Sequence, residues 1–429
     1  MPPGHNDVLR EEFVRMFDQF EAIDSPWSLY EFQVALADAI RRAEPASFAE
    51  GSSPQKDHLR RLRRLGDGVA WKYLHPHVIR QLAKNDGGSA PISVQKGFNR
   101  TLSLAERYAK DGLEVVIADL TTCIRVGDVI VCTDPERPAI LESGGHPAWN
   151  SRGRKGRQHR RGRAIQELLH IGAGFLDGQA TPVVTVEISI DSEHSWPALE
   201  KAITRAINEG FAAVSHSPGD MIVAVENVDD TATALKQAAE SMAGWRRVEL
   251  GIIRVLEHLP DPRIAPPSVW ATSAASRLAV LLSDVYVAHL VDPYQFLGRY
   301  SDESAIVDIR AVHDVESFIA KVHESELELS GHFLDDVLFG FSTIDSTRKR
   351  MLAFAQETTT IQPDMPGIAP GDVLRIDSVE DAVRAVSATR GPNPPKFVSI
   401  PGTVLEDLIS RLRERPESDS PTNLEVSSD

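Results

Sequence analysis

The chain has 429 residues, 42% of them hydrophobic and 25% charged, a composition typical of globular proteins with about two or three domains. Its formal net charge of -16 argues against a surface that coats nucleic acid nonspecifically. A local basic region could still bind nucleic acid, because salt screens exposed charges beyond roughly 8–10 Å. No run approaches the ~18 apolar residues of a membrane span, so we expect a cytoplasmic protein without a membrane partner.

Residues 1–99 show mainly the three- and four-residue apolar spacing of helices, which predicts a helical region. One of its segments, residues 58–74, carries a basic cluster formed by Arg60, Arg61, Arg63 and Arg64. This cluster could be a second phosphate-contacting face, or its arginines could pair with the many acids of the chain. We favour the pairing with acids, because most charged helical faces have that role.

Residues 100–192 change from a helical period to the two-residue period of strands after Leu113. Two short β-branched runs flank the turn sequence "DPERP" at 134–138, which predicts an antiparallel hairpin. A helix over 163–171 and a strand over 181–190 follow, so we expect a small α/β domain with a mixed sheet. Cys123 and Cys132 lie in apolar runs of this region, where buried core residues are more common than a disulfide.

Residues 193–415 alternate between helical and strand patterns, which predicts a further α/β domain of unknown role that could contact a protein partner. Because the segment 315–324 follows a predicted strand in this alternation, we expect it to be a helix. The last segment, residues 416–429, is too polar to pack, and we expect it to be disordered. The predicted fold class is therefore α/β, with a helical N-terminal region, a small sheet domain and a C-terminal α/β domain.

The predicted hairpin has a carboxylate at the beginning of its first strand, Asp128, and another at the end of its second strand, Glu142. An antiparallel hairpin brings these two ends together. Two neighbouring carboxylates repel each other unless a cation lies between them. Mg²⁺ suits such a pair, since it usually binds one or two carboxylates and keeps waters for a phosphate.

A dense basic segment follows the hairpin, with seven Lys or Arg residues and no acid among residues 152–163. Solvated surfaces usually mix the two signs of charge, so this segment favours contact with a phosphodiester backbone. The predicted nucleic-acid-binding residues are Arg152, Arg154, Arg157, Arg160, Arg161 and Arg163.

The order of a helical acid, an aspartate, a glutamate and a glutamine in a basic helix resembles the PD-(D/E)xK nuclease superfamily over residues 100–190. The resemblance implies that Asp128 and Glu142 are catalytic and bind Mg²⁺ or Mn²⁺, with Glu106 as a further metal ligand. It also implies that Gln158 supports the site and contacts the DNA backbone. Loosely, the chain is similar to nuclease-like proteins of prokaryotic defence and repair loci.

The sequence departs from this family at Gly144, where the lysine that polarises the attacking water is expected. Lys155 or Arg154 of the basic segment could supply the missing cation. Loss of that lysine without a substitute would slow the reaction roughly 10²–10⁴-fold. Two functions therefore stay open: metal-dependent cleavage of nucleic acid, with DNA favoured over RNA, and non-catalytic binding of nucleic acid or protein by a nuclease-like fold.

Overall fold

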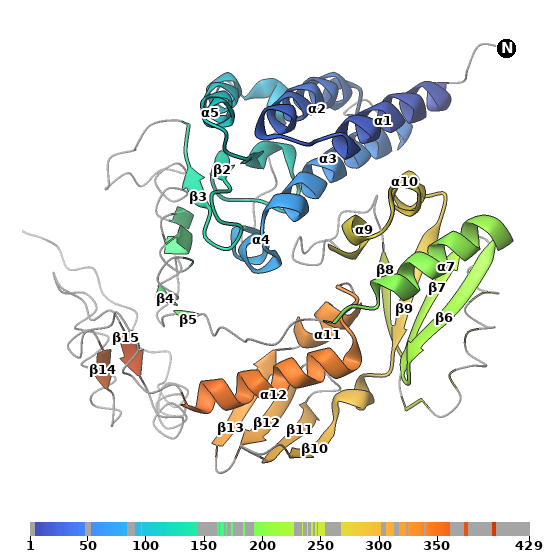
Figure 1. Cartoon of the computed structure of the whole chain (residues 1–429), viewed down its shortest axis with the longest axis vertical. Helices are drawn as coiled ribbons and strands as arrows, with labels where there is room; N and C mark the ends of the chain where they lie inside the picture. The colour runs from blue at the N-terminus through green and yellow to red at the C-terminus, as the bar shows by residue number, and fades with distance from the viewer. Residues whose placement is uncertain are drawn as a thin grey trace, which may run out of the picture.

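The computed structural model is a mixed α/β structure of helices and small, mostly antiparallel sheets (Figure 1). It describes residues 5–47, 53–83, 91–95, 97–143, 161–162, 164–166, 169, 173–174, 183–184, 193–226, 234, 238, 242, 245–246, 248–253, 267–301, 306–312, 317–322, 325–330, 332–338, 340–360, 373–375 and 397–399. The predicted tail at 416–429 lies outside these residues. Within them, no helix is long and apolar enough to cross a membrane.

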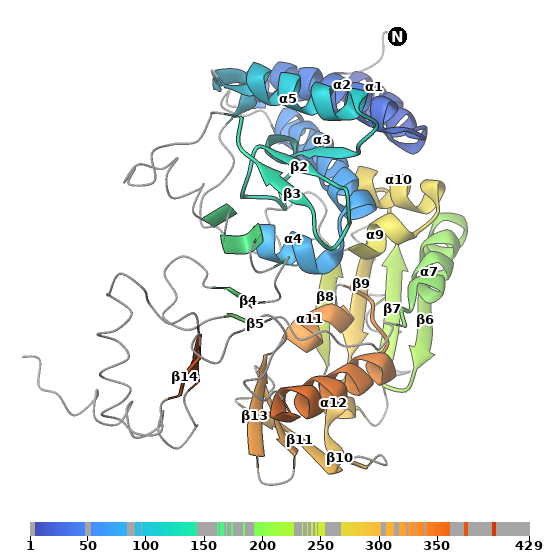
Figure 2. The ribbon, with the colours of Figure 1, turned by 60° about the vertical axis from the view of Figure 1, so that its left-hand side comes forward.

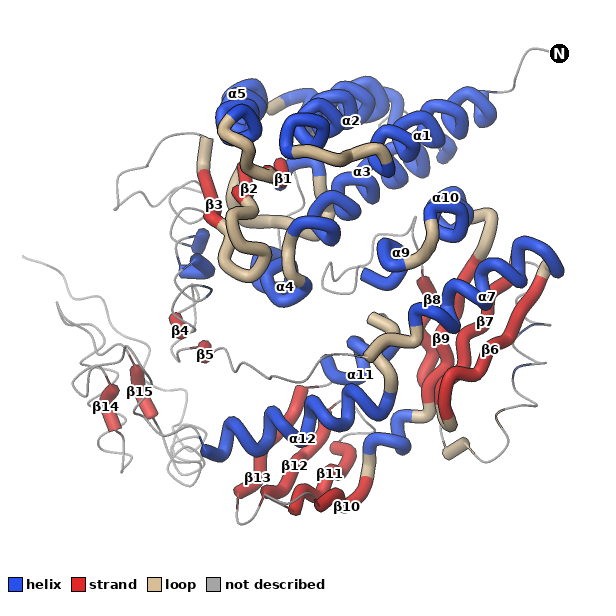
Figure 3. Tube along the Cα trace, in the orientation of Figure 1, coloured by secondary structure: helices blue, strands red, loops and turns tan. Residues whose placement is uncertain are grey.

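The N-terminal part is helical, as the apolar spacing predicts (Figure 3). Its helices bury large apolar side chains, among them Phe13, Leu36 and Leu62, in one core. The helical elements are α1 (His5–Glu21), α2 (Pro26–Ser47), α3 (Ser53–Tyr73), α4 (Pro76–Ala83), the short 3₁₀ helix η1 (Ile92–Val94) and α5 (Phe98–Lys110).

A three-stranded antiparallel sheet packs against these helices, in the order β1-β2-β3. Its elements are β1 (Val115–Ile117), the 3₁₀ helix η2 (Ala118–Leu120), β2 (Val129–Val131) and β3 (Ala139–Leu141). Strands β2 and β3 pair from Val131 with Ala139 to Val129 with Leu141, which confirms the predicted hairpin. Cys123 and Cys132 are buried and free, as expected.

A four-stranded antiparallel sheet with the order β6-β7-β9-β8 forms the next part of the chain, and α7 lies beside it (Figure 2). Leu199 of α7 and Val287 of β9 belong to the same buried cluster as the N-terminal helices. The elements are α7 (Trp196–Glu209), β6 (Phe211–Ser217), β7 (Asp220–Val225), β8 (Glu249–Ile253), α9 (Pro267–Ala271), α10 (Ala274–Leu282) and β9 (Tyr286–Val291).

A second four-stranded antiparallel sheet runs in chain order, and α12 lies across it (Figure 1). The third strand of this sheet lies within residues 315–324, where the sequence pattern predicts a helix, so that prediction is wrong. Phe318, Ala320 and Val322 are buried at every second position, which is the period of a strand. The elements are η5 (Pro293–Phe296), β10 (Gly298–Ser301), β11 (Ile306–Val312), β12 (Ser317–Val322), β13 (Ser325–Ser330), α11 (His332–Leu338) and α12 (Ile344–Thr360).

Two short strand pairs complete the described elements. Strands β4 (Ala173–Gly174) and β5 (Val183–Val184) are antiparallel, and β5 confirms a strand within the predicted segment 181–190. Strands β14 (Val373–Arg375) and β15 (Phe397–Ser399) are parallel. Because the two four-stranded sheets are antiparallel throughout, they need no helical crossover between neighbouring strands.

The buried carboxylate of Asp67 in α3 holds the loop that leads from η2 to β2. Its side chain is 1% exposed. Oδ1 accepts the Cys123 N–H at 3.0 Å, and Oδ2 accepts the Thr122 hydroxyl at 2.6 Å and the Arg64 guanidinium at 2.9 Å. Gly66 permits this close approach, since a Cβ at that position would overlap the backbone carbonyl of Leu120.

Three of the four arginines in the basic cluster of α3 pair with acids of the chain, which confirms for these three the pairing that we favoured. Arg63 donates to Glu44 at 2.8 Å, Arg64 to Asp67, and Arg60 to Asp57 at 3.0 Å. Arg61 donates to the Leu282 carbonyl at 3.3 Å. Arg61, Arg63 and Arg64 therefore join α3 to other parts of the chain, whereas Arg60 pairs within α3.

We predict that Asp67→Ala lowers the free energy of unfolding by about 3–5 kcal/mol, because it removes the buried acceptor of the Arg64 guanidinium, the Thr122 hydroxyl and the Thr122 and Cys123 N–H groups. Asp57→Ala is the matched control, since Asp57 also pairs with an arginine three residues away on α3 but is far more exposed. It should cost less than about 1 kcal/mol. Urea denaturation measures both values, and equal losses would contradict the role given to Asp67.

Candidate nucleic-acid and metal site

The backbone places Asp128 at the open end of the hairpin. Gly127 precedes it with a φ of +83°, a conformation that favours glycine, and turns the chain into β2. The Asp128 N–H donates to the Leu141 carbonyl at 2.9 Å, and its carbonyl accepts the Ala118 N–H at 3.1 Å. Asp128 is therefore held from both sides, by β3 and by the first residue of η2.

The Asp128 carboxylate is oriented by Ser143. Its Oδ2 accepts the Ser143 N–H at 2.8 Å and the Ser143 hydroxyl at 2.7 Å. The Ser143 hydroxyl also lies 3.1 Å from the hydroxyl of Thr101, a buried residue of α5. Because the Ser143 hydrogen points to the carboxylate, Thr101 is the donor in that second contact. This chain of three side chains fixes the carboxylate against the preceding helix.

Glu142 lies between Leu141 and Ser143, the two residues to which Asp128 is hydrogen-bonded. Its side chain is half-buried. The hairpin therefore brings the two predicted metal carboxylates to the same end of β2 and β3. That they share one cation stays a prediction.

The described contacts of Glu106 lie on a different side of α5 from Thr101, which contacts Ser143. Its carboxylate accepts a hydrogen bond from Lys110 at 2.6 Å, one helical turn later. It also lies near Tyr30 of α2, whose phenol pKa is raised by burial and by this negative charge. Among the described residues, no group of three or more His, Cys, Asp or Glu side chains that could hold a metal ion is found. The metal role of Glu106 stays a prediction.

The end of the basic segment packs on the hairpin. Arg161 and Gly162 are helical, and a Cβ on Gly162 would lie 3.5 Å from Val126 Cγ1 and 3.6 Å from Ile140 Cγ2. Ile165 and Leu169, which follow the segment, belong to the core that contains β1 and β2. The described end of the basic segment therefore packs on the hairpin against residues that stand two positions before Asp128 and Glu142.

The remaining predicted residues of the site lie outside the described residues. They are Gly144, Arg152, Arg154, Lys155, Arg157, Gln158, Arg160 and Arg163. Their predicted roles rest on the sequence alone.

Sequence reasoning missed Ser143 and Thr101, the two residues that orient Asp128. Ser143 directly follows Glu142, and a hydroxyl residue beside a candidate ligand is a weak signal that could have been noted. Thr101 gives no local signal, because it is 42 residues distant and reaches the site only through packing.

Comparisons with known proteins add no relative to this description. None of the family models, curated proteins or solved structures compared with the chain gave a match.

Proposed function

We propose that the protein binds nucleic acid, with DNA favoured over RNA, at the open end of the β2–β3 hairpin and along the adjacent basic segment. We propose further that Mg²⁺ or Mn²⁺ held by the hairpin carboxylates supports phosphodiester cleavage there. The resemblance to PD-(D/E)xK nucleases belongs to this proposal, as does a role in prokaryotic defence or repair.

The observation that carries the proposal is the position of Ile140 between two glycines. A Cβ on Gly127 would lie 2.7 Å from Ile140 Cγ2, and a Cβ on Gly162 would lie 3.6 Å from the same atom. Gly127 precedes Asp128, and Gly162 follows Arg161. The Ile140 side chain therefore lies between the beginning of β2, next to Asp128, and the end of the basic segment. A site that binds a metal ion and a phosphate requires both carboxylates and cations.

The donor set suits a magnesium ion that keeps several waters. Asp128 and Glu142 supply the one or two carboxylates that such an ion usually takes from a protein. Ser143 and Thr101 act as the outer partners that orient a metal-binding carboxylate. When bound, the ion would polarise a phosphoryl oxygen and favour ionisation of a water. The basic segment would hold the nucleic-acid backbone.

A non-catalytic binding module is the alternative, and Gly144 is the feature that favours it. Glycine has no side chain that could activate a water at the position where the related nucleases have lysine. The same hairpin and basic segment would then hold nucleic acid or a protein partner without cutting.

We predict that the double variant Arg157→Glu, Arg160→Glu weakens DNA binding and flattens its salt dependence. Each phosphate contact that is lost should lower the slope of log K against log[salt] by about 0.9 on duplex DNA. Fluorescence anisotropy over a series of salt concentrations measures the slope. The control is Arg205→Glu, Arg310→Glu, which changes the total charge equally at two exposed arginines of α7 and β11. Equal slopes in both double variants would exclude the basic segment as the binding surface.

We predict that Gly144→Lys creates or increases Mg²⁺-dependent cleavage of plasmid DNA, and that Glu142→Ala in the same chain abolishes the gain. The added lysine would supply the cation that activates water. Gly97→Lys is the control, because it adds the same charge at the beginning of α5, where a Cβ would meet nothing within 4 Å.

A thermal melt establishes first that the Gly144→Lys protein is folded. If the folded variant binds both Mg²⁺ and DNA but never cuts, the nuclease proposal fails and the binding module replaces it.

A further inference from the structure

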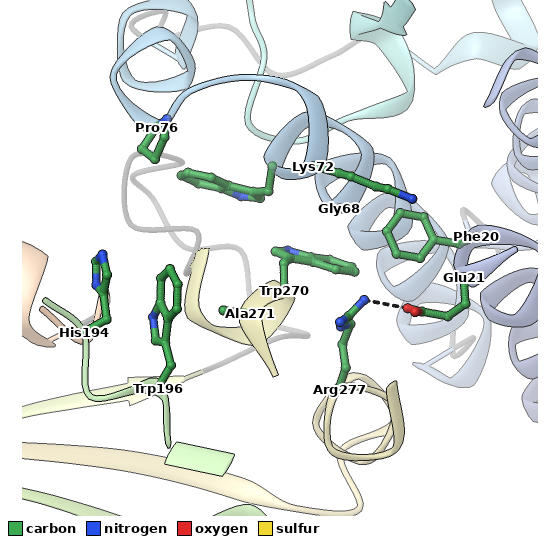
Figure 4. A pocket seen from close by; sticks show the side chains of 11 residues that line it. Phe20, Glu21, Gly68, Lys72, Pro76, His194, Trp196, Trp270, Ala271 and Arg277 are labelled. Atoms are coloured by element: carbon green, nitrogen blue, oxygen red, sulfur yellow. Dashed lines mark hydrogen bonds and ion pairs between the residues drawn. The ribbon is translucent and has the colours of Figure 1, made fainter. Parts of the chain in front are cut away.

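A cavity of about 530 Å³, which no hairpin residue lines, lies between the N-terminal helices and the beginning of the second half (Figure 4). A volume between roughly 300 and 1,000 Å³ is usual for small-molecule sites. The residues that line it come from α1, α3, α4, α9, α10 and the beginning of α7 with the loop before it.

The cavity has flat aromatic walls that are fixed before any ligand arrives. The rings of His194 and Trp196 are stacked, 4.0 Å apart at an angle of 6°. Trp196 Nε1 donates to the Gly340 carbonyl at 3.2 Å, which fixes the plane of the indole. Figure 4 shows His194 on the far side of Trp196 from Trp270, so the other face of the indole is directed into the cavity. That face can stack against a planar ring.

Trp270 forms the opposite wall and is held by close packing. A Cβ on Gly68 would lie 2.5 Å from its ring, so only a glycine in α3 lets the indole sit there. The Phe20 ring packs edge-on against Trp270, with centroids 5.4 Å apart.

The charge of the lining favours an anion. Lys72 and Arg277 are positive and Glu21 is negative, so one positive charge remains. Burial lowers the pKa of His194, which therefore adds no charge near neutral pH. Arg277 and Lys72 each already lie 5.8 Å from the centre of a ring, Trp270 and Phe20 respectively, so a second cation is disfavoured at these two faces.

Two buried N–H groups of the lining residues have no acceptor among the described residues. They are Trp71 Nε1 and Arg277 Nε, and both can only donate. Buried donors are normally paired, so these two call for a ligand that brings acceptors.

From these observations we propose that the cavity binds a nucleoside 5′-monophosphate, with its base stacked on Trp196 and its phosphate beside Lys72 and Arg277. A nucleotide combines a planar ring, several acceptors and a negative group, which are the three properties that the walls select. The nucleotide could be free or the terminal unit of a strand. The site is separate from the hairpin and does not depend on metal-ion chemistry.

Isothermal titration of the full-length protein with AMP, GMP, CMP and UMP, without divalent metal, tests the proposal. We expect saturable binding of at least one monophosphate, and binding of its nucleoside at least 10-fold weaker. Trp196→Ala and Arg277→Gln should each weaken the monophosphate about 10-fold or more, because they remove the stacking face and the phosphate partner respectively. Trp196→Phe should stay within a few fold of the original affinity, since it keeps an aromatic face.

Arg10→Gln is the matched control for the arginine. Arg10 joins α1 to Asp284, just after α10, at 2.6 Å, and Arg277 joins α10 to Glu21 of α1 at the same distance, but only Arg277 lines the cavity. The control should bind as the original chain does. A 5′-phosphorylated oligonucleotide that binds through Trp196 and Arg277 where free monophosphates do not would assign the site to a strand end, which also supports the proposal.

Three results would overturn it. The first is no binding of any monophosphate or 5′-phosphorylated oligonucleotide. The second is equal affinity for nucleoside and monophosphate. The third is an equal loss in Arg10→Gln and Arg277→Gln, which would mean that the helix contact and not the cavity matters.

Discussion

The buried carboxylate of Asp67 is the contact on which the position of the proposed hairpin site depends. It binds the loop at Thr122 and Cys123 to α3, and that loop leads directly into Gly127 and β2. Gln33 of α2 makes a similar contact with β1, accepting the Ile117 N–H and donating to the Val115 carbonyl, both at 2.8 Å. A short sheet of three-residue strands has little stability alone, so these helix contacts keep the hairpin in place.

The features that sequence reasoning predicted depend on neighbouring residues. The β2–β3 hairpin follows from two β-branched runs around one turn, and the N-terminal helices follow from their apolar period. The prediction of a helix at 315–324 is wrong because a short apolar run fits either a helix or a strand. The alternation of predicted helices and strands along the chain favoured the helix, whereas residues 317–322 form a strand. The role of Asp67 was not predicted, because Asp67 lies in a basic helix and the sequence does not reveal which side of that helix is buried.

The candidate sites divide in the same way. Asp128 and Glu142 could be found because a hairpin brings residues 14 positions apart together. Thr101 and the cavity could not be found, since Trp71, Trp196 and Trp270 meet only through the packing of separate helices. The α3 arginines are engaged within the chain, so the proposed interface relies on the basic segment at 152–163 for its positive charge. A strongly acidic protein can bind nucleic acid in this way only where its cations are concentrated.

Amide hydrogen exchange, followed by mass spectrometry with and without duplex DNA and Mg²⁺, tests whether nucleic acid binds at the hairpin and the basic segment. We expect slower exchange on DNA addition in peptides that cover residues 128–143 and 152–169, and no change over 317–330 of the distant sheet. Slower exchange confined to other parts of the chain, or no change anywhere at saturating DNA, would contradict the claim that nucleic acid binds at the hairpin and the basic segment.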